Sequence, residues 1–314
     1  MVDLTFRQLR YFDAFARHLH FGRAALEVAV TQPALSMQIA DLEARLGAQL
    51  IERTRRGLTL TSEGAEFARR SQRILADMRD LIDHAQKNDR FSRGPLRLGA
   101  IPSVAPYVLP RLLPKLRSAY PDLEINLRET LTRQLTQELL DGKLDLLLLA
   151  LPLETPGIET LALLEDRFLL AVPHGYGAPE PLLSVEEIIS QETLLLLEEG
   201  HCLRDQALSF CNLGRDSQLN LLGVSSISTV VQMVANGHGV TLLPEIAAEF
   251  ETRHSDIRLM RFSEPQPSRN LGLAWRSGSP YKSEFLQYGE LICQSMQTLE
   301  PDKPHAARQI GPPN

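Results

Sequence analysis

The sequence has no apolar stretch long enough to cross a membrane. Its most apolar run, Leu144 to Leu153, covers about ten residues and includes Asp145, whereas a membrane-spanning helix needs about 20 apolar residues. No basic segment followed by an apolar run opens the chain, so we expect no secretory leader. These absences predict a soluble cytoplasmic protein without a membrane partner.

The sequence also has few cysteines, three among its 314 residues. In a reducing compartment a disulfide acts more often as a sensor than as a structural brace. There is no Cys-x-x-Cys motif and no nucleotide-binding fingerprint, which argues against a thiol enzyme. His201, Cys202 and Cys211 lack a clear fourth ligand, so we expect neither a metal site nor another cofactor.

The length and the charge distribution indicate several domains with different partners. The chain is long enough for two or three domains, and its 43% apolar residues suffice for a sizeable core. Residues 1–90 carry a charge balance of +2, and the remainder carries −8. The amino-terminal part is therefore the better candidate for binding a polyanion.

Two of the cysteines lie in the segment 200–211, which reads as the start of a helix. A thiol at a helix N-terminus, beside an imidazole and a guanidinium, is a place where the thiolate is favoured. Cys202, with His201 and Arg204 beside it, is therefore the candidate nucleophile. The competing interpretation is two unrelated cysteines of the core, since free cysteine is often buried.

The spacing of this pair has a mechanical consequence. If the segment is helical, the Cα atoms of Cys202 and Cys211 lie about 13–14 Å apart. A disulfide requires a Cα separation of about 4.4–6.8 Å. A bond between these cysteines would therefore require the helix to unwind, as in a conformational switch.

Residues 1–62 predict two helices, a tight turn, a third helix and a hairpin with a basic tip. The third helix has Thr31 as its N-cap, ends at Gly47 and carries one apolar stripe, Leu35, Ile39, Leu42 and Leu46. This arrangement favours a winged helix-turn-helix over a fragment of an ordinary helical bundle. We expect DNA contacts from the third helix and the wing, at Thr31, Gln32, Pro33, Ser36, Gln38, Arg53, Arg55 and Arg56.

Residues 63–93 predict a long linker helix and a hinge, the hinge at 88–94. The helix carries a narrow apolar stripe, Phe67, Ile74, Met78, Leu81 and Ala85. A stripe this narrow is typical of a seam between two chains. The alternative is packing against the helix's own domain.

From residue 94 to about 300, predicted strands and helices alternate. The strands are 96–101, 123–129, 144–149, 194–197, 240–244 and 271–275, and the helices are 104–119, 131–141 and 281–298. This alternation predicts a doubly wound α/β domain with a parallel sheet. Ser103, Thr132 and Cys202 each follow a strand, at the edge where such sheets bind ligands, although single residues there are often helix caps. The tail 301–314 is predicted to be disordered.

The amino-terminal motifs resemble the winged helix of LysR-type transcriptional regulators. They read Phe21-x-x-Ala24-Ala25, Thr31-Gln32-Pro33-Ala34-Leu35-Ser36-x-Gln38-Ile39-x-x-Leu42-Glu43, Leu46-Gly47 and Thr61-x-x-Gly64. One departure is Ala40, where the family often has a basic residue. The resemblance implies a periplasmic-binding-protein-like effector domain, with subdomain I at about 94–167 and 269–300 and subdomain II at about 168–268.

A second resemblance points to the peroxide-sensing members of that family. It rests on Leu197-Glu198-Glu199-Gly200-His201-Cys202-Leu203-Arg204-Asp205-Gln206-Ala207 with Phe210-Cys211, and on Gly239-Val240-Thr241-Leu242-Leu243-Pro244. It implies a peroxidatic Cys202, a resolving Cys211, and a peroxide site lined by Ser103, Thr132, His201 and Arg204. Ser103 stands where the family commonly has Thr.

The resemblance also implies the partners of the protein. We expect double-stranded promoter DNA, hydrogen peroxide and RNA polymerase as partners, and a homotetramer built as a dimer of dimers. In the alternative interpretation, a regulator of the same fold answers a small metabolite bound between its subdomains, and the cysteines are incidental.

Overall fold

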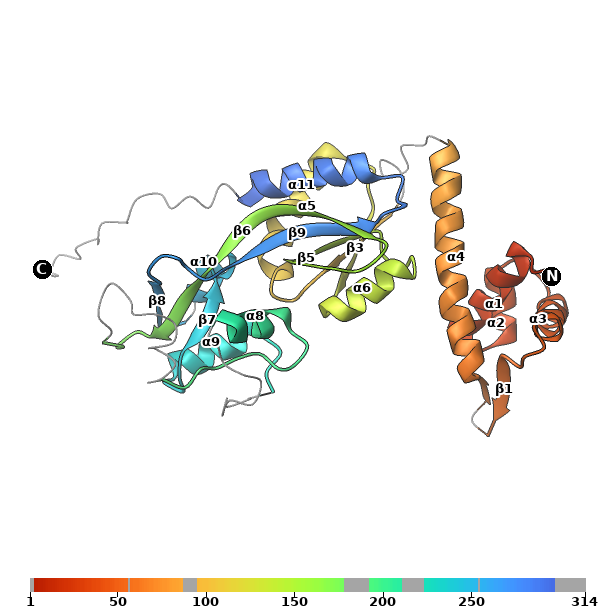
Figure 1. The fold of residues 1–314 in the computed structure, drawn as a ribbon, viewed down its shortest axis with the longest axis horizontal. Helices are drawn as coiled ribbons and strands as arrows, with labels where there is room; N and C mark the ends of the chain where they lie inside the picture. Colours follow the sequence, from red (N-terminus) through yellow and green to blue (C-terminus); the bar gives the residue numbers. More distant parts are fainter. Residues whose placement is uncertain are drawn as a thin grey trace, which may run out of the picture.

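A computed structural model describes the chain over residues 3–55, 57–86, 95–177, 192–210, 223–253 and 255–296. Within these ranges, buried apolar side chains form two separate cores. One core lies among the amino-terminal helices, the other lies in the larger domain that follows, and the long helix α4 (Ser62–Gln86) stands between them (Figure 1). In this described part of the chain, no helix is long and apolar enough to cross a membrane.

The amino-terminal domain is a winged helix-turn-helix, as predicted. Its elements are α1 (Phe6–His18), α2 (Phe21–Glu27), α3 (Gln32–Leu46) and the antiparallel hairpin of β1 (Ile51–Thr54) and β2 (Gly57–Leu60). The Thr31 side chain caps α3, and Gly47 ends the helix in the left-handed conformation, with a φ of 64°. The stripe of α3 is buried at Leu35, Ile39 and Leu42, so local caps and periodicity determine how this helix sits.

Helix α4 packs against both domains of its own chain and leaves an apolar surface exposed. Asp80 accepts two hydrogen bonds from Arg276 Nη2, at 3.1 Å to Oδ1 and 3.0 Å to Oδ2. Phe67 packs against the amino-terminal core. Ile74 and Leu81, which belong to the same predicted stripe, are exposed. Part of this helix therefore packs within its own chain, which was the alternative to a seam between two chains. The exposed part remains available to another chain.

The larger domain is built on one mixed sheet. Among the described residues it has seven strands in the order β4-β3-β5-β9-β6-β7, with β8 paired to β6. They are β3 (Leu96–Ala100), β4 (Ile125–Glu129), β5 (Leu146–Leu151), β6 (Ile158–Pro173), β7 (Thr241–Pro244), β8 (Ile257–Arg261) and β9 (Ser268–Arg276). Only the pairs of β3 with β4 and β5 are parallel, whereas β9 and β6 pair antiparallel with their neighbours. The α/β class is confirmed, but the prediction of a parallel sheet is wrong for its central strands.

Two long strands, β6 and β9, connect the two halves of this domain (Figure 1). β6 pairs with β9 as far as Arg167, and with β7 and β8 from Phe168 onward. The strand β6 has no local signal in the sequence, because its burial does not alternate and a bulge between Ala162 and Leu164 interrupts its register. A strand of this kind is defined by its partners and not by a local period.

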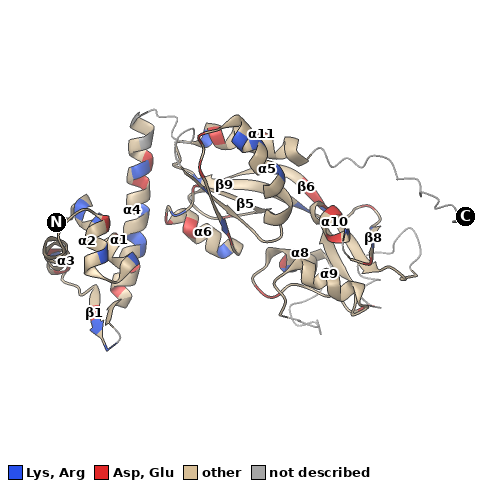
Figure 2. Ribbon diagram, turned by 180° about the vertical axis from the view of Figure 1, so that it is seen from behind, with Lys and Arg blue, Asp and Glu red and all other residues tan. Residues whose placement is uncertain are grey.

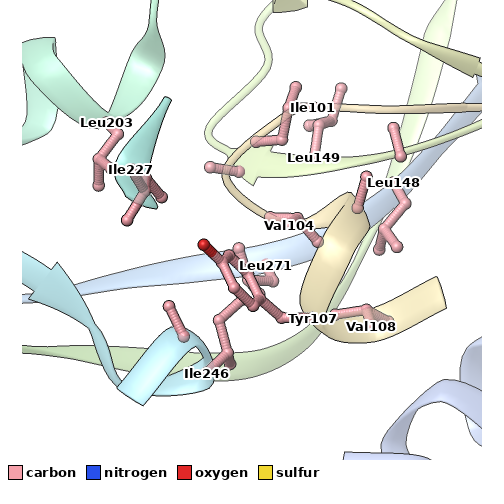
Figure 3. Close-up of a cluster of buried hydrophobic side chains, with 14 of the residues drawn as sticks. Ile101, Val104, Tyr107, Val108, Leu148, Leu149, Leu203, Ile227, Ile246 and Leu271 are labelled. Atoms are coloured by element: carbon pink, nitrogen blue, oxygen red, sulfur yellow. The ribbon is translucent and has the colours of Figure 1, made fainter. Parts of the chain in front are cut away.

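Helices cover the sheet and close the domain. They are α5 (Ala105–Ala119), α6 (Thr132–Leu140), α8 (Cys202–Phe210), α9 (Ile227–Ala235), α10 (Glu245–Thr252) and α11 (Lys282–Met296). Figure 3 shows part of their shared core, to which Leu203 and Ile227 contribute from one half and Ile101, Val104 and Tyr107 from the other.

Three further predictions concern residues 194–197, 88–94 and 301–314. Residues 194–197, predicted as a strand, form only an isolated bridge from Leu194 to Val240 before the chain enters α8. The predicted hinge at 88–94 and the tail at 301–314 lie outside the described residues.

Candidate functional site

The Cys202 thiol stands at the first residue of α8. Gly200 has a φ of 95°, a conformation that L side chains rarely adopt, and this turn leads the chain into the helix. The His201 carbonyl then accepts hydrogen bonds from the amides of Arg204 at 3.0 Å and Asp205 at 3.4 Å. The position of the thiol at a helix N-terminus therefore follows from this turn.

The structure brings Ser103, Thr132, His201 and Cys202 together around one small hollow. Ser103 follows β3, and Thr132 begins α6 after β4, so the ends of neighbouring strands place both hydroxyls opposite α8. As it stands, the hollow has no free volume for a water-sized molecule. It shares Ser103 and His201 with an adjoining cleft of about 320 Å³, whose lining does not include Cys202.

Burial and polar neighbours act in opposite directions on the Cys202 thiol. Burial raises the pKa of Cys202 and is the largest influence. The charge of Arg269, the hydroxyls of Thr132 and Ser103 and the amide of Leu203 lower that pKa, but the net direction is upward. The expectation of a strongly favoured thiolate is therefore wrong for this conformation, in which the resting thiol is protonated.

Arg269 is a charged group of this site that was not predicted from the sequence. Its guanidinium donates from Nε to Asp166 Oδ2 at 2.8 Å, from Nη1 to Ser103 Oγ at 3.0 Å and from Nη2 to the Ser103 carbonyl at 3.1 Å. Arg269 reaches the site from β9, 67 positions beyond Cys202 in the sequence. The only local signal was a lone arginine at the start of an apolar strand.

The contact with Arg269 also determines what the Ser103 hydroxyl can do. A guanidinium only donates hydrogen bonds, so Ser103 Oγ accepts from Arg269 and its own proton is free for another acceptor. The Cys202 sulfur is such an acceptor, and the Ser103 hydroxyl lowers its pKa. The buried Thr132 Oγ1 makes no hydrogen bond of ordinary geometry with the described residues. Its polar neighbour is the Cys202 thiol, whose pKa it lowers.

Arg204 does not line this hollow, contrary to expectation. Its side chain is buried against a separate apolar hollow under α8, with Leu203 and Val230 in its wall. The Nη1 atom lies 4.0 Å from Glu199 Oε1, and Nε has no hydrogen-bond partner among the described residues. The guanidinium near the thiol is that of Arg269, because Arg204 points into the core on the inner face of α8.

His201 is buried beside the thiol, and burial lowers its pKa below the ordinary value. Its Nε2 lies 3.9 Å from Glu198 Oε1, which partly opposes that effect. A neutral imidazole offers one donor and one acceptor, so His201 supplies a hydrogen bond and not a positive charge at neutral pH.

The lowered pKa of His201 predicts that the folded protein loses stability in acid. A histidine whose pKa is lowered by folding binds fewer protons in the native state than in the unfolded state. Stability therefore falls as the pH drops through about 6.5, the ordinary histidine pKa. Compared with His201→Gln, the parent should lose about 1 kcal/mol more between pH 8 and pH 5.5. Urea unfolding followed by fluorescence of Trp275, the only tryptophan, measures this, and an equal loss in both proteins would contradict it.

Of the other two cysteines, the structure describes Cys293 but not Cys211. Cys211 follows the last residue of α8 and lies outside the described residues, so its pairing with Cys202 stays a prediction. Cys293 lies half-buried on α11, where its Sγ contacts the Leu163 carbonyl at 3.4 Å. It lies apart from the hollow.

The candidate DNA surface is the outer face of α3 together with the wing. Thr31, Gln32, Pro33 and Ser36 are exposed and Gln38 is half-buried, while Arg53 and Arg55 project from the wing and Arg56 lies outside the described residues. Figure 2 shows basic residues at β1. None of these residues belongs to the α3 stripe that packs into the core. The Thr31 side chain also caps the helix.

Comparison with known proteins identifies the family of the chain. Residues 6–65 match the family described as bacterial regulatory helix-turn-helix protein, lysR family, and residues 89–289 match the LysR substrate binding domain. The chain belongs to the LysR family of transcriptional regulators. This LysR-type regulator is 42% identical to a probable hydrogen peroxide-inducible genes activator of Streptomyces viridosporus, over 93% of this chain and 94% of that protein. It is 38% identical to the DNA-binding transcriptional dual regulator OxyR of Escherichia coli (strain K12), over 92% and 95%.

Solved structures show the same relationship. A full-length OxyR variant from Pseudomonas aeruginosa superposes with a TM-score of 0.79 at 31% identity, covering 92% of this chain and 95% of that one. A mutant of Corynebacterium glutamicum OxyR with bound hydrogen peroxide has a TM-score of 0.62 at 33% identity, covering 94% of each chain. The protein is thus an OxyR-like DNA-binding regulator and not an enzyme.

The wing gives a prediction about salt dependence. Arg53→Ala should weaken binding to all duplex sequences alike, because it removes a phosphate contact, and should reduce the slope of log affinity against log salt by about 1. Arg17→Ala is the control, since Asp13 and Glu27 already neutralise that guanidinium. Fluorescence anisotropy on specific and random duplexes measures both effects. Loss of sequence discrimination alone in the Arg53 variant would refute the assignment of the wing.

Proposed function

We propose that this LysR-type regulator senses hydrogen peroxide through Cys202 and converts that reaction into altered promoter binding, with RNA polymerase as a further partner. The supporting observation is the juxtaposition of the thiol with the hydroxyls of Ser103 and Thr132, and with Arg269 behind Ser103. Peroxide is small and water-like, so a few convergent polar groups suffice to orient it. The names of the relatives support the same ligand.

In the proposed reaction, one molecule of hydrogen peroxide oxidises two thiols. The Cys202 thiolate attacks one peroxide oxygen, the O–O bond breaks, and the leaving hydroxide takes up a proton to become water. Cys202 is then a sulfenic acid. The Cys211 thiolate attacks its sulfur to form the disulfide, and the oxygen leaves as a second water after protonation. The two thiols lose two electrons, and the peroxide gains both.

Forming this disulfide requires α8 to unwind. The helix is intact from Cys202 to Phe210, which puts the Cα atoms of these two residues about 12 Å apart. The next Cα atom is about 3.8 Å from that of Phe210, too little to reach the separation of about 6 Å that a disulfide needs. Phe210 packs against Phe168 of β6, with ring centroids 5.3 Å apart. Bringing Cys211 to Cys202 therefore pulls Phe210 from the strand that links the two subdomains. This movement would alter the spacing of the DNA-binding domains.

Thiol titration tests this proposal. One equivalent of peroxide should remove two of the three thiols per chain, and dithiothreitol should restore both. Mass spectrometry should place the new bond between Cys202 and Cys211. Unchanged thiol content after peroxide would refute the proposed function.

The cleft supports a second candidate function. Its volume of about 320 Å³ suits a small metabolite, and its walls carry Tyr107, Glu129 and Glu251 together with serine hydroxyls. In that case peroxide would leave the thiols unchanged, and a metabolite would raise the melting temperature and shift operator binding. The titration therefore separates the two candidates.

The exposed apolar surface of α4 supports one of the two interfaces that the expected homotetramer, a dimer of dimers, requires. Ile74, Leu81 and Ile82 are all exposed on this helix, and exposed apolar side chains at helical spacing favour association with a second helix. Light scattering of the full chain at micromolar concentration should give the mass of four chains. Leu81→Glu with Ile74→Glu should lower that mass, whereas a parent that is already monomeric would refute the assembly.

A further inference from the structure

Asp166 forms a buried ion pair with Arg269 at the crossover between the two subdomains. The two residues are register partners on β6 and β9, next to the position where β6 changes partners. Their side chains are 0% and 1% exposed. Asp166 Oδ2 accepts from Arg269 Nε at 2.8 Å, and Oδ1 accepts from the amide of Ile246 at the start of α10 at 3.1 Å. Each carboxylate oxygen of Asp166 therefore accepts a hydrogen bond, which holds the side chain in place.

Arg269 lies between this carboxylate and the redox site. Its Nε faces Asp166, while its Nη atoms bind Ser103, whose hydroxyl borders the hollow of Cys202. A buried cation requires a counter-ion. Burial raises the pKa of Asp166, while the charge of Arg269 and the amide of Ile246 act against that rise. Hydrogen-bonded to both groups, the carboxylate is the counter-ion of Arg269 in the resting state, and after ionisation the Cys202 thiolate competes for the same positive charge.

We propose that Asp166 is a positioning residue that holds Arg269 as its counter-ion and thereby limits how readily the Cys202 thiol ionises. This inference rests on the proposed function, because it concerns the same thiol. With Asp166 charged, ionisation of Cys202 leaves one net negative charge in a buried site. With a neutral side chain at that position, ionisation would produce a neutral pair of Arg269 and thiolate. Asp166 thus keeps the thiolate fraction of the resting sensor low.

The other charged or titratable groups near the thiol do not replace this effect. His201, which precedes α8, is neutral at neutral pH because burial lowers its pKa. Glu129, at the end of β4, lines the adjoining cleft, and its negative charge would oppose ionisation as Asp166 does. Arg269 is the positive group that lowers the pKa of Cys202. A group that pairs with Arg269 therefore also affects the ionisation of the thiol.

The test is the pH profile of alkylation at Cys202. In the full chain, Cys211 and Cys293 are first replaced by Ser so that iodoacetamide reports on one thiol. Adding Asp166→Asn removes a negative charge and leaves Arg269 without its counter-ion, so that the guanidinium acts on the thiol alone. The apparent pKa of Cys202 should fall by at least about one unit, since an unopposed opposite charge nearby lowers a pKa by about 1–3 units. The thiolate fraction at pH 7 should rise about tenfold.

A matched control separates charge from general destabilisation. Asp145 is also a buried carboxylate paired with an arginine, Arg97, at 2.8 Å, but it lies at the opposite end of the parallel strands from the thiol. Asp145→Asn should leave the pKa of Cys202 unchanged. An unchanged or raised thiol pKa in the Asp166→Asn chain would overturn the proposal.

A second variant decides the question if Asp166→Asn does not fold. Asp166→Glu keeps the charge, so the pKa of Cys202 should stay within about half a unit of the parent, and a shift of a full unit would refute a role based on charge. Alkylation needs no peroxide. A parent thiol that ignores peroxide would therefore refute the proposed function while leaving the role of Asp166 measurable.

Discussion

Cys202→Ser is expected to abolish the response to peroxide completely. A serine hydroxyl at this position neither ionises at neutral pH nor forms a sulfenic acid, so the first step of the switch cannot occur. The fold should be kept, because serine has nearly the size of cysteine and α8 is stabilised by other contacts, among them the buried side chains of Leu203 and Leu208. Promoter footprints with and without peroxide should be identical to each other and to that of the reduced parent.

The other two cysteines provide the controls. Cys211→Ser should still form the sulfenic acid, detectable with dimedone, but should then over-oxidise because no thiol resolves it. Cys293→Ser should behave as the parent, since this thiol lies on α11 away from the hollow. If the Cys202→Ser protein still changed its footprint on treatment with peroxide, the reactive thiol would lie elsewhere.

The amino-terminal domain could be predicted because local signals define it. The Thr31 cap, the Gly47 end and the stripe of Leu35, Ile39 and Leu42 each act within one or two helical turns, and all occur as expected. Propensity, capping and periodicity agree in such a segment, so a single sequence is enough.

The central sheet could not be predicted in the same way. The direction of β9 and the length of β6 depend on partners more than 100 residues away, as the pairing of Asp166 with Arg269 shows. Neither strand alternates throughout, because the carboxyl-terminal part of each is buried on both faces. Without a period of two residues, a buried strand gives no local signal of its partners or of its direction.

The hollow beside Cys202 contains four of the five predicted residues, Ser103, Thr132, His201 and Cys202, but not Arg204. Ser103 and Thr132 lie there because they follow the parallel strands β3 and β4, and His201 and Cys202 because they lie at the start of α8. The choice between Arg204 and Arg269 depends on which face of α8 is buried, and the thiol pKa depends on how much water is excluded. Neither quantity is encoded in spacing, so proximity in sequence pointed to the wrong guanidinium.

Arg269→Met is expected to destabilise the larger domain by about 3–5 kcal/mol, because removing one partner leaves Asp166 as an unpaired buried charge. The variant also loses the two hydrogen bonds to Ser103. Trp275 is the only tryptophan and lies buried on the same strand, so its fluorescence during denaturant unfolding follows this domain. The midpoint should fall markedly while the slope stays close to that of the parent.

The double variant distinguishes a charge effect from a packing effect. Adding Asp166→Asn to Arg269→Met removes the unpaired charge, and the asparagine oxygen can still accept from the amide of Ile246. The double variant should therefore be more stable than Arg269→Met alone, with a coupling energy of about 1–3 kcal/mol. Strictly additive losses would show that the two side chains contribute by packing, and that Asp166 does not act as the counter-ion of Arg269.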